Sequence, residues 1–239
     1  FSRSLRYRRY LVGYKRGKYN FTDILSLNKM GWMVGLQMGL ETALFSITGI
    51  MIGWLGSIAL AAHQVMVAIS TLGFMIYYGV GAAVSVRVSN YFGRQDLLHV
   101  RRTTMAGFHL ILCLAVCACT VFLFSRELIG YLFTTSEEVI RVVSTLVYIL
   151  LAYQFGDALQ ITYANSLRGI GDVISMAVIS FIGYFLIAMP VCYICGFVLE
   201  WGITGIWIGY PIGLTLTGVM LCGRYYWKLK TKTQSKEFY

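Results

Sequence analysis

The chain has 239 residues, of which 58% are hydrophobic and 13% are charged, and its mean hydropathy is +0.69. A soluble domain usually carries about 25% charged residues, so this composition argues against a soluble protein and predicts an all-α integral membrane protein. The formal net charge is +10. The basic residues cluster at the ends of apolar segments, which indicates contact with anionic lipid rather than with nucleic acid.

Residues 1–29 contain eight of the basic residues. They lack the apolar run and cleavage site of a signal peptide, so we interpret them as a cytoplasmic connector. The chain starts with Phe1, and we expect it to be a piece of a longer protein. Residues 21–27 predict either a short amphipathic segment on the membrane surface or a plain loop.

Residues 30–228 predict six transmembrane helices, followed by a basic cytoplasmic tail at 229–239. Residues 30–86 carry a single formal charge, on Glu41, and this stretch is too long for one span of about 20 residues. A glycine-containing break at 53–57 divides it into two. The six predicted spans are about 31–53, 60–88, 103–125, 142–167, 173–199 and 201–223.

The distribution of positive charge predicts the orientation. Six spans place both ends of the chain on one side of the membrane, and that side carries eighteen of the 20 lysine and arginine residues. The other side carries Arg126 and Arg141. Because cytoplasmic loops are enriched in lysine and arginine, both ends are predicted to be cytoplasmic. We interpret Arg168, beside a loop on that side, as a topology signal and lipid contact.

Local signals mark three of the predicted helices. Thr135 and Glu138 have the spacing of a capping box just before the fourth span. Pro190 and Pro211 lie inside the fifth and sixth spans, and we expect them to bend these helices.

Two carboxylates lie where the sequence otherwise excludes charge, Glu41 in the first span and Asp157 in the fourth. An ionisable group at bilayer depth costs roughly 2.5–3.5 kcal/mol on insertion scales, so both are candidates for function. Two facing carboxylates are suited to bind a monovalent cation such as Na⁺ or to take up H⁺, and we predict no other cofactor or metal. The alternative is that each acid is neutral and hydrogen-bonds between helices.

Each carboxylate belongs to a polar stripe along one face of its helix. Exposure of either stripe to lipid would cost free energy, so both are predicted to face the bundle interior or a hydrated cavity. The stripes consist of Gln37, Glu41 and Thr48 on the first span and of Tyr153, Asp157, Gln160 and Ala164 on the fourth.

Other polar residues give weaker signals. His63 and Gln64 start the second span. Together with Gln37, Thr48 and Gln160 they are candidates for substrate-cavity or supporting polar residues, although an interfacial histidine is usually structural. We find no phosphate loop, zinc-protease motif or nucleophile elbow, so the sequence does not predict an enzyme.

Five segments resemble the multidrug and toxic compound extrusion (MATE) family, and its NorM-like branch in particular, in family order and at family spacing. The resemblance covers nearly all of the chain after about residue 20. The segments are 40–46 (LETALFS), 61–65 (AAHQV), 81–88 (GAAVSVRV), 153–160 (YQFGDALQ) and 166–172 (SLRGIGD).

This resemblance implies twelve helices in two six-helix lobes, of which the chain is the second, with an N-terminal six-helix lobe as its partner. It implies that Glu41, Asp157 and Tyr153 belong to a cation site. Family members can carry an asparagine where this chain has Ala68, so one possible cation ligand is missing and the choice between Na⁺ and H⁺ stays open.

The function implied by the resemblance is export of small cationic, amphipathic, drug-like compounds in exchange for Na⁺ or H⁺, by alternating access, in the cytoplasmic (inner) membrane of a bacterium. One alternative is a lipid-linked oligosaccharide flippase of the same superfamily, whose anionic substrate favours deep basic residues. Another is a channel or a non-transporting membrane subunit.

Overall fold

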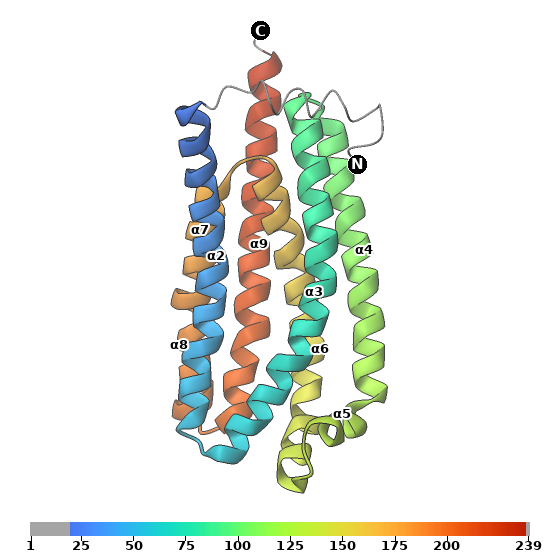
Figure 1. The fold of residues 1–239 in the computed structure, drawn as a ribbon, viewed down its shortest axis with the longest axis vertical. Coiled ribbons are helices and arrows are strands. Elements are labelled where there is room, and N and C mark those ends of the chain that lie inside the picture. The colour runs from blue at the N-terminus through green and yellow to red at the C-terminus, as the bar shows by residue number, and fades with distance from the viewer. Residues whose placement is uncertain (1–19, 238–239) are drawn as a thin grey trace.

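The computed structural model describes residues 20–237, with side chains up to residue 232. Six helices are long and apolar enough to cross a membrane, and they stand side by side as one bundle (Figure 1). Their bounds are Phe21–Gly53 (α2), Ser57–Gly93 (α3), Leu97–Phe124 (α4), Glu137–Gly169 (α6), Val173–Val198 (α7, η1, α8 and η2) and Gly202–Glu237 (α9). The protein is therefore an all-helical, multi-pass membrane protein.

The helices begin and end near the charged segments. Residues 1–19 of the predicted connector lie outside the described residues. Residues 21–27 are the first turns of α2 and not a separate segment or loop, because Asn20 caps this helix by accepting a hydrogen bond from the Thr22 amide (3.3 Å). Residues 229–237 of the predicted tail continue α9.

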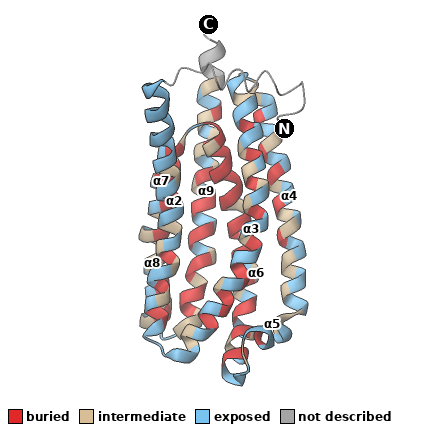
Figure 2. Cartoon of the chain, in the orientation of Figure 1, coloured by how far each residue is buried: buried red, intermediate tan, exposed pale blue. Residues whose placement is uncertain are grey.

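Helix α6 forms the centre of the bundle. It packs against α3, α4 and α9, and buried residues concentrate on α6 and α9, whereas α2 and α4 are largely exposed (Figure 2). Two glycines let the fifth membrane helix approach α9 closely: a Cβ on Gly205 would meet the Cys195 carbonyl, and one on Gly209 would meet Cys192. Small residues allow such backbone contact between membrane helices.

The two prolines affect their helices differently. Pro190 lies at the start of the short helix α8 (Met189–Tyr193), which is flanked by the π-helical segments η1 (Ile182–Ala188) and η2 (Ile194–Val198). A proline lacks the amide hydrogen that a regular helix uses, and wider turns accommodate that loss. Pro211 lies inside α9, which continues through it as a single helix (Figure 1).

Helix α3 is the bent helix of the bundle. Its first part runs obliquely and the rest stands upright, so that α2 and α3 diverge from their shared turn (Figure 1). The Val67 carbonyl accepts hydrogen bonds from the hydroxyls of Ser70 (3.0 Å) and Thr71 (2.8 Å). Hydroxyls that bond back to the preceding turn compete with the backbone and often bend helices.

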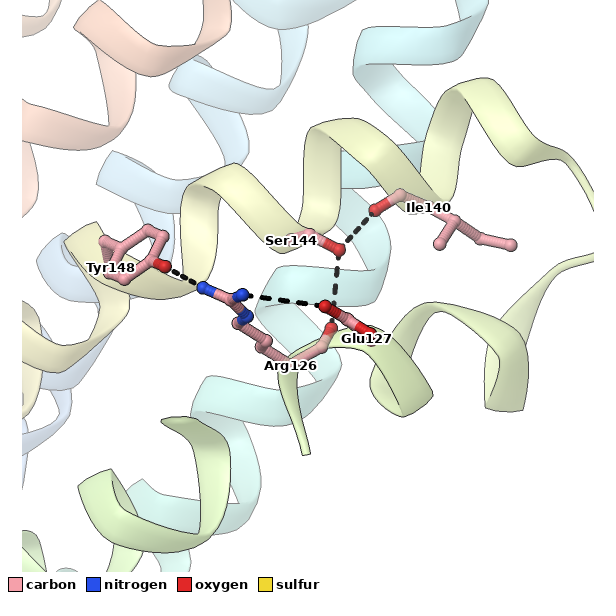
Figure 3. Close-up of polar contacts among 5 residues, drawn as sticks. All are labelled: Arg126, Glu127, Ile140, Ser144 and Tyr148. Atoms are coloured by element: carbon pink, nitrogen blue, oxygen red, sulfur yellow. Dashed lines mark hydrogen bonds and ion pairs between the residues drawn. The ribbon is translucent and has the colours of Figure 1, made fainter. Parts of the chain in front are cut away.

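The short helix α5 (Arg126–Phe133) is held against α6 by polar contacts (Figure 3). The Arg126 guanidinium donates to the Tyr148 hydroxyl and lies 3.5 Å from the Glu127 carboxylate. The backbone carbonyl of Arg126 accepts a hydrogen bond from the Ser144 hydroxyl (3.4 Å). The predicted capping box is wrong, because the N-cap of α6 is Ser136 and its side chain makes no capping hydrogen bond. Before α6, the Thr134 hydroxyl accepts a hydrogen bond from the Ser136 amide (3.2 Å), and the helix begins at Glu137.

An ion pair ties the turn after α6 to α9. Arg224 Nε donates to Asp172 Oδ2 at 2.8 Å, and Ser175 donates to the other oxygen at 2.8 Å. Partial burial opposes ionisation of Asp172, but these hydrogen bonds and the positive charges of Arg224 and Lys228 outweigh it and lower the pKa of Asp172. The folded state is therefore stabilised by the ionised carboxylate.

We predict that Asp172→Asn lowers the free energy of unfolding by about 1–2 kcal/mol at pH 7, because it weakens a partly buried charged hydrogen bond. The stabilisation of a group whose folded pKa is depressed is present above the unfolded pKa of about 3.9 and is lost as pH falls through the folded value. Thermal unfolding of the full-length protein in detergent should therefore separate wild type and variant at pH 7, and should separate them less below about pH 4. An unchanged difference across that range would contradict the assignment.

Candidate cation-binding site

A cavity of about 260 Å³ opens where α2 and α3 diverge. Glu41 and Phe45 of α2 form one wall, Ser70 and Phe74 of α3 form the opposite wall, and Tyr153 of α6 contributes from behind. The Phe45 and Tyr153 rings meet edge to face, with 6.5 Å between their centres. The cavity is therefore mostly apolar and aromatic, with one carboxylate in its wall.

Glu41 is half-buried and is surrounded by hydrogen-bond donors from three membrane helices. Its Oε2 accepts from Gln37 Nε2 (3.2 Å), one turn earlier on α2, and from the Tyr184 hydroxyl (3.3 Å) in η1. Gln160 of α6 donates to the Tyr184 oxygen at 2.6 Å and also lies close to Glu41. Donors aimed at one carboxylate stabilise its ionised form.

Asp157 has a contrasting environment. It is fully buried, and neither of its oxygens has a hydrogen-bond partner among the residues that the structure describes. Asp157 lies on α6 between Tyr153 and Gln160, which both lie beside Glu41, so the charges of the two carboxylates are close enough to repel each other. Burial of an ionised carboxylate without donors is energetically costly. Asp157 therefore needs either a proton, which removes its charge, or a bound cation, which balances it.

Comparison with known proteins identifies the family of the chain that carries these two carboxylates. A MatE family model matches residues 34–194. The chain belongs to the MatE family. Its relatives include the multidrug resistance protein NorM of Photobacterium profundum, which is 34% identical over 220 residues, covering 90% of this chain and 47% of the relative. NorM of Vibrio cholerae serotype O1 is 33% identical over 214 residues, covering 87% and 47%.

Solved structures show the same MatE fold. The eukaryotic MATE transporter AtDTX14 superposes with a TM-score of 0.80 at 20% identity, over 91% of this chain and 51% of that one. The Vibrio cholerae MATE transporter VcmN in the bent form gives a TM-score of 0.83 at 15% identity, over 92% and 50%. The chain spans about half the length of the curated relatives it matches.

The remaining predicted site residues of this MatE chain lie in different places. Gln37, Gln160 and Tyr153 surround Glu41, as described above. Thr48 is buried two turns away and shares a 2.5 Å hydrogen bond with Tyr210. His63 is buried with its ring centre 5.7 Å from that of Trp207, whereas Gln64 and Ala68 are exposed. The lining of the cavity beside Glu41 does not include Thr48, His63, Gln64 or Ala68.

Sequence reasoning missed three polar residues near the carboxylates. Tyr184, the donor to Glu41, lies in an apolar span and is one of 17 tyrosines, so no sequence pattern distinguishes its role. Gln154 and Tyr77 are buried, and the Gln154 amide and the Tyr77 hydroxyl lack partners among the described residues. Gln154 was detectable, because it is an amide in an apolar span three residues before Asp157.

A second, small cavity of about 20 Å³ also borders Glu41, and its lining includes Gln37, Tyr78, Asn165 and Arg168. Arg168 is half-buried, and its guanidinium turns into the bundle, where it contacts Gln37 and Tyr78 at 3.4 Å each. The interpretation of Arg168 as a lipid contact is therefore wrong, whereas its contribution to the orientation of the chain stays a prediction.

We predict that Glu41 is accessible from the larger cavity and Asp157 is not. In the full-length protein with its native cysteines replaced, Glu41→Cys should react with a small water-soluble thiol reagent. Asp157→Cys should react severalfold more slowly, because Asp157 is fully buried and does not line either of the two cavities beside Glu41. Thr71→Cys, at an exposed position of the cavity wall, serves as the reactive control. Equal rates at residues 41 and 157 would place Asp157 on the cavity wall and contradict the structure.

Proposed function

We propose that the chain is the C-terminal lobe of a MATE-type antiporter that exports cationic amphipathic compounds in exchange for Na⁺ or H⁺. The observation that carries the proposal is the position of Glu41. This carboxylate lines the larger cavity and interacts electrostatically with Asp157, which is buried without donors. Cation binding at this pair and occupation of the cavity would therefore affect one another through Glu41.

The cavity wall suits the proposed substrates. Aromatic faces attract organic cations, and methionines adapt to ligands of different shapes. Phe45, Phe74 and Tyr153 supply the rings, and Met38 and Met75 supply flexible apolar contact. The multidrug resistance function named for the NorM relatives is consistent with this wall.

Transport would require a partner lobe. The chain spans about half of each relative, and rocking of two lobes around a central site is a common transporter design. We propose that an N-terminal six-helix lobe closes the cavity on its open side. We also propose that the protein lies in the bacterial inner membrane with both ends of this chain in the cytoplasm, as the charge distribution predicts.

The competing functions make different predictions. A flippase for an anionic lipid-linked oligosaccharide would favour a basic cavity, whereas the charged residue in the wall of the larger cavity is Glu41. A channel would dissipate a substrate gradient. Counter-flow in proteoliposomes separates it from an antiporter, because an antiporter exchanges cation for substrate across the membrane.

We predict that Glu41→Gln or Asp157→Asn in the full-length protein abolishes cation-driven ethidium efflux, because each substitution removes a charge that the driving cation must balance. The amount of folded protein should be unchanged, since both replacements are close in size to the originals. The assay is ethidium efflux from proteoliposomes under an imposed H⁺ or Na⁺ gradient. Gln64→Leu, at an exposed position outside both cavities, is the control and should transport normally. Wild-type efflux in either carboxylate variant would refute the proposed cation site.

A further inference from the structure

Arg168 places a positive charge beside the candidate cation site. It lies in the last turn of α6, and its guanidinium contacts three neutral oxygens, those of Asn165 (3.2 Å), Tyr78 (3.4 Å) and Gln37 (3.4 Å). Its Nε is buried without a hydrogen-bond partner among the described residues. A partly buried guanidinium that contacts neutral acceptors needs a negative charge nearby to balance it.

Gln37 links this guanidinium to Glu41. The Gln37 amide oxygen accepts from Arg168, and the amide nitrogen of the same side chain donates to Glu41 Oε2 at 3.2 Å. The cavity of about 20 Å³ touches both charged groups, and a space of that size holds about one water molecule. Arg168 and Glu41 therefore interact across one amide and one small cavity, and their charges attract.

The other charged groups near Arg168 are already balanced or more remote. Asp172, four residues further along the chain, pairs with Arg224 of α9. Within residues 20–232, Arg168 makes no direct ion pair. Glu41 is thus the acid to which its charge is coupled, and Asp157 remains without a fixed counter-charge.

We propose that Arg168 is a built-in counter-charge to Glu41, so that the site takes up one monovalent cation rather than two. With both carboxylates ionised, Glu41, Asp157 and Arg168 together carry a charge of minus one, which one H⁺ or one Na⁺ neutralises. Arg168 acts through Gln37 and is a positioning residue. This inference rests on the proposed antiport function and adds to it the number of monovalent cations that the site takes up.

The first test removes the counter-charge. Binding of the driving cation to the purified full-length protein is measured by the displacement of ethidium, with either H⁺ or Na⁺ as titrant. Arg168→Gln should lower the half-saturating cation concentration by roughly tenfold, because two carboxylates then face the cation without a fixed positive charge. Arg168→Lys keeps the charge and should stay near wild type. Arg126→Gln removes the same charge at the α5 end of the lobe and is the matched control.

The second test is charge complementation. Glu41→Gln alone brings the summed charge of Arg168 and Asp157 to zero, so cation-dependent displacement should be lost. The double variant Glu41→Gln, Arg168→Gln restores a charge of minus one at Asp157 and should regain displacement that the single variant lacks. Rescue of this kind cannot arise from a purely structural role of Arg168.

The outcomes separate the inference from the proposed function. If wild type shows no cation-dependent displacement or efflux, the antiport proposal fails, and this inference fails with it. If wild type responds but the double variant is as inactive as Glu41→Gln, the counter-charge role is refuted and the antiport proposal stands. Equal effects of Arg168→Lys and Arg168→Gln would also refute the counter-charge role. Such a result would show that the geometry of the guanidinium matters and its charge does not.

Discussion

An ionised group inside a bundle of apolar helices needs a partner, because neither lipid nor packed side chains can replace the water that it loses. This cost explains how the polar residues of the lobe are arranged. Glu41 is surrounded by donors from α2, α6 and η1, and Arg168 reaches it through Gln37. Asp157 has no donor among the described residues. The contrast between the environments of the two acids supports the cation site that we propose.

The packing of α6 makes this arrangement possible. This helix is buried against α3, α4 and α9, and it carries Tyr153, Asp157, Gln160 and Arg168 along its length. By contrast, α2 and α3 diverge, and the bend of α3 leaves the cavity between them (Figure 1). The lobe thus combines a tightly packed helix, α6, with a more open pair of helices, α2 and α3, whose cavity we propose as the ligand site.

Much of this could be predicted from the sequence, because the cost of charge in a membrane leaves a visible pattern. The long uncharged segments indicated six membrane helices, and the spacing of Gln37 with Glu41 and of Asp157 with Gln160 placed these residues on shared faces. Contacts between distant helices left no such pattern. Tyr184 looks like any other tyrosine of an apolar span, and Arg168 looks like an interfacial topology signal until its guanidinium is seen to turn inward.

The donors around Glu41 have a thermodynamic consequence. Gln37, Tyr184 and Gln160 come from three separate membrane helices, so a rigid shift of one helix against the others changes the number of donors that reach the carboxylate. A helix arrangement that alters the affinity of Glu41 for a cation must, by linkage, be favoured or disfavoured by that cation to the same extent. In the proposed antiporter, the carboxylate and its donors would therefore convert the chemical potential of a cation into a preference for one packing of the lobe.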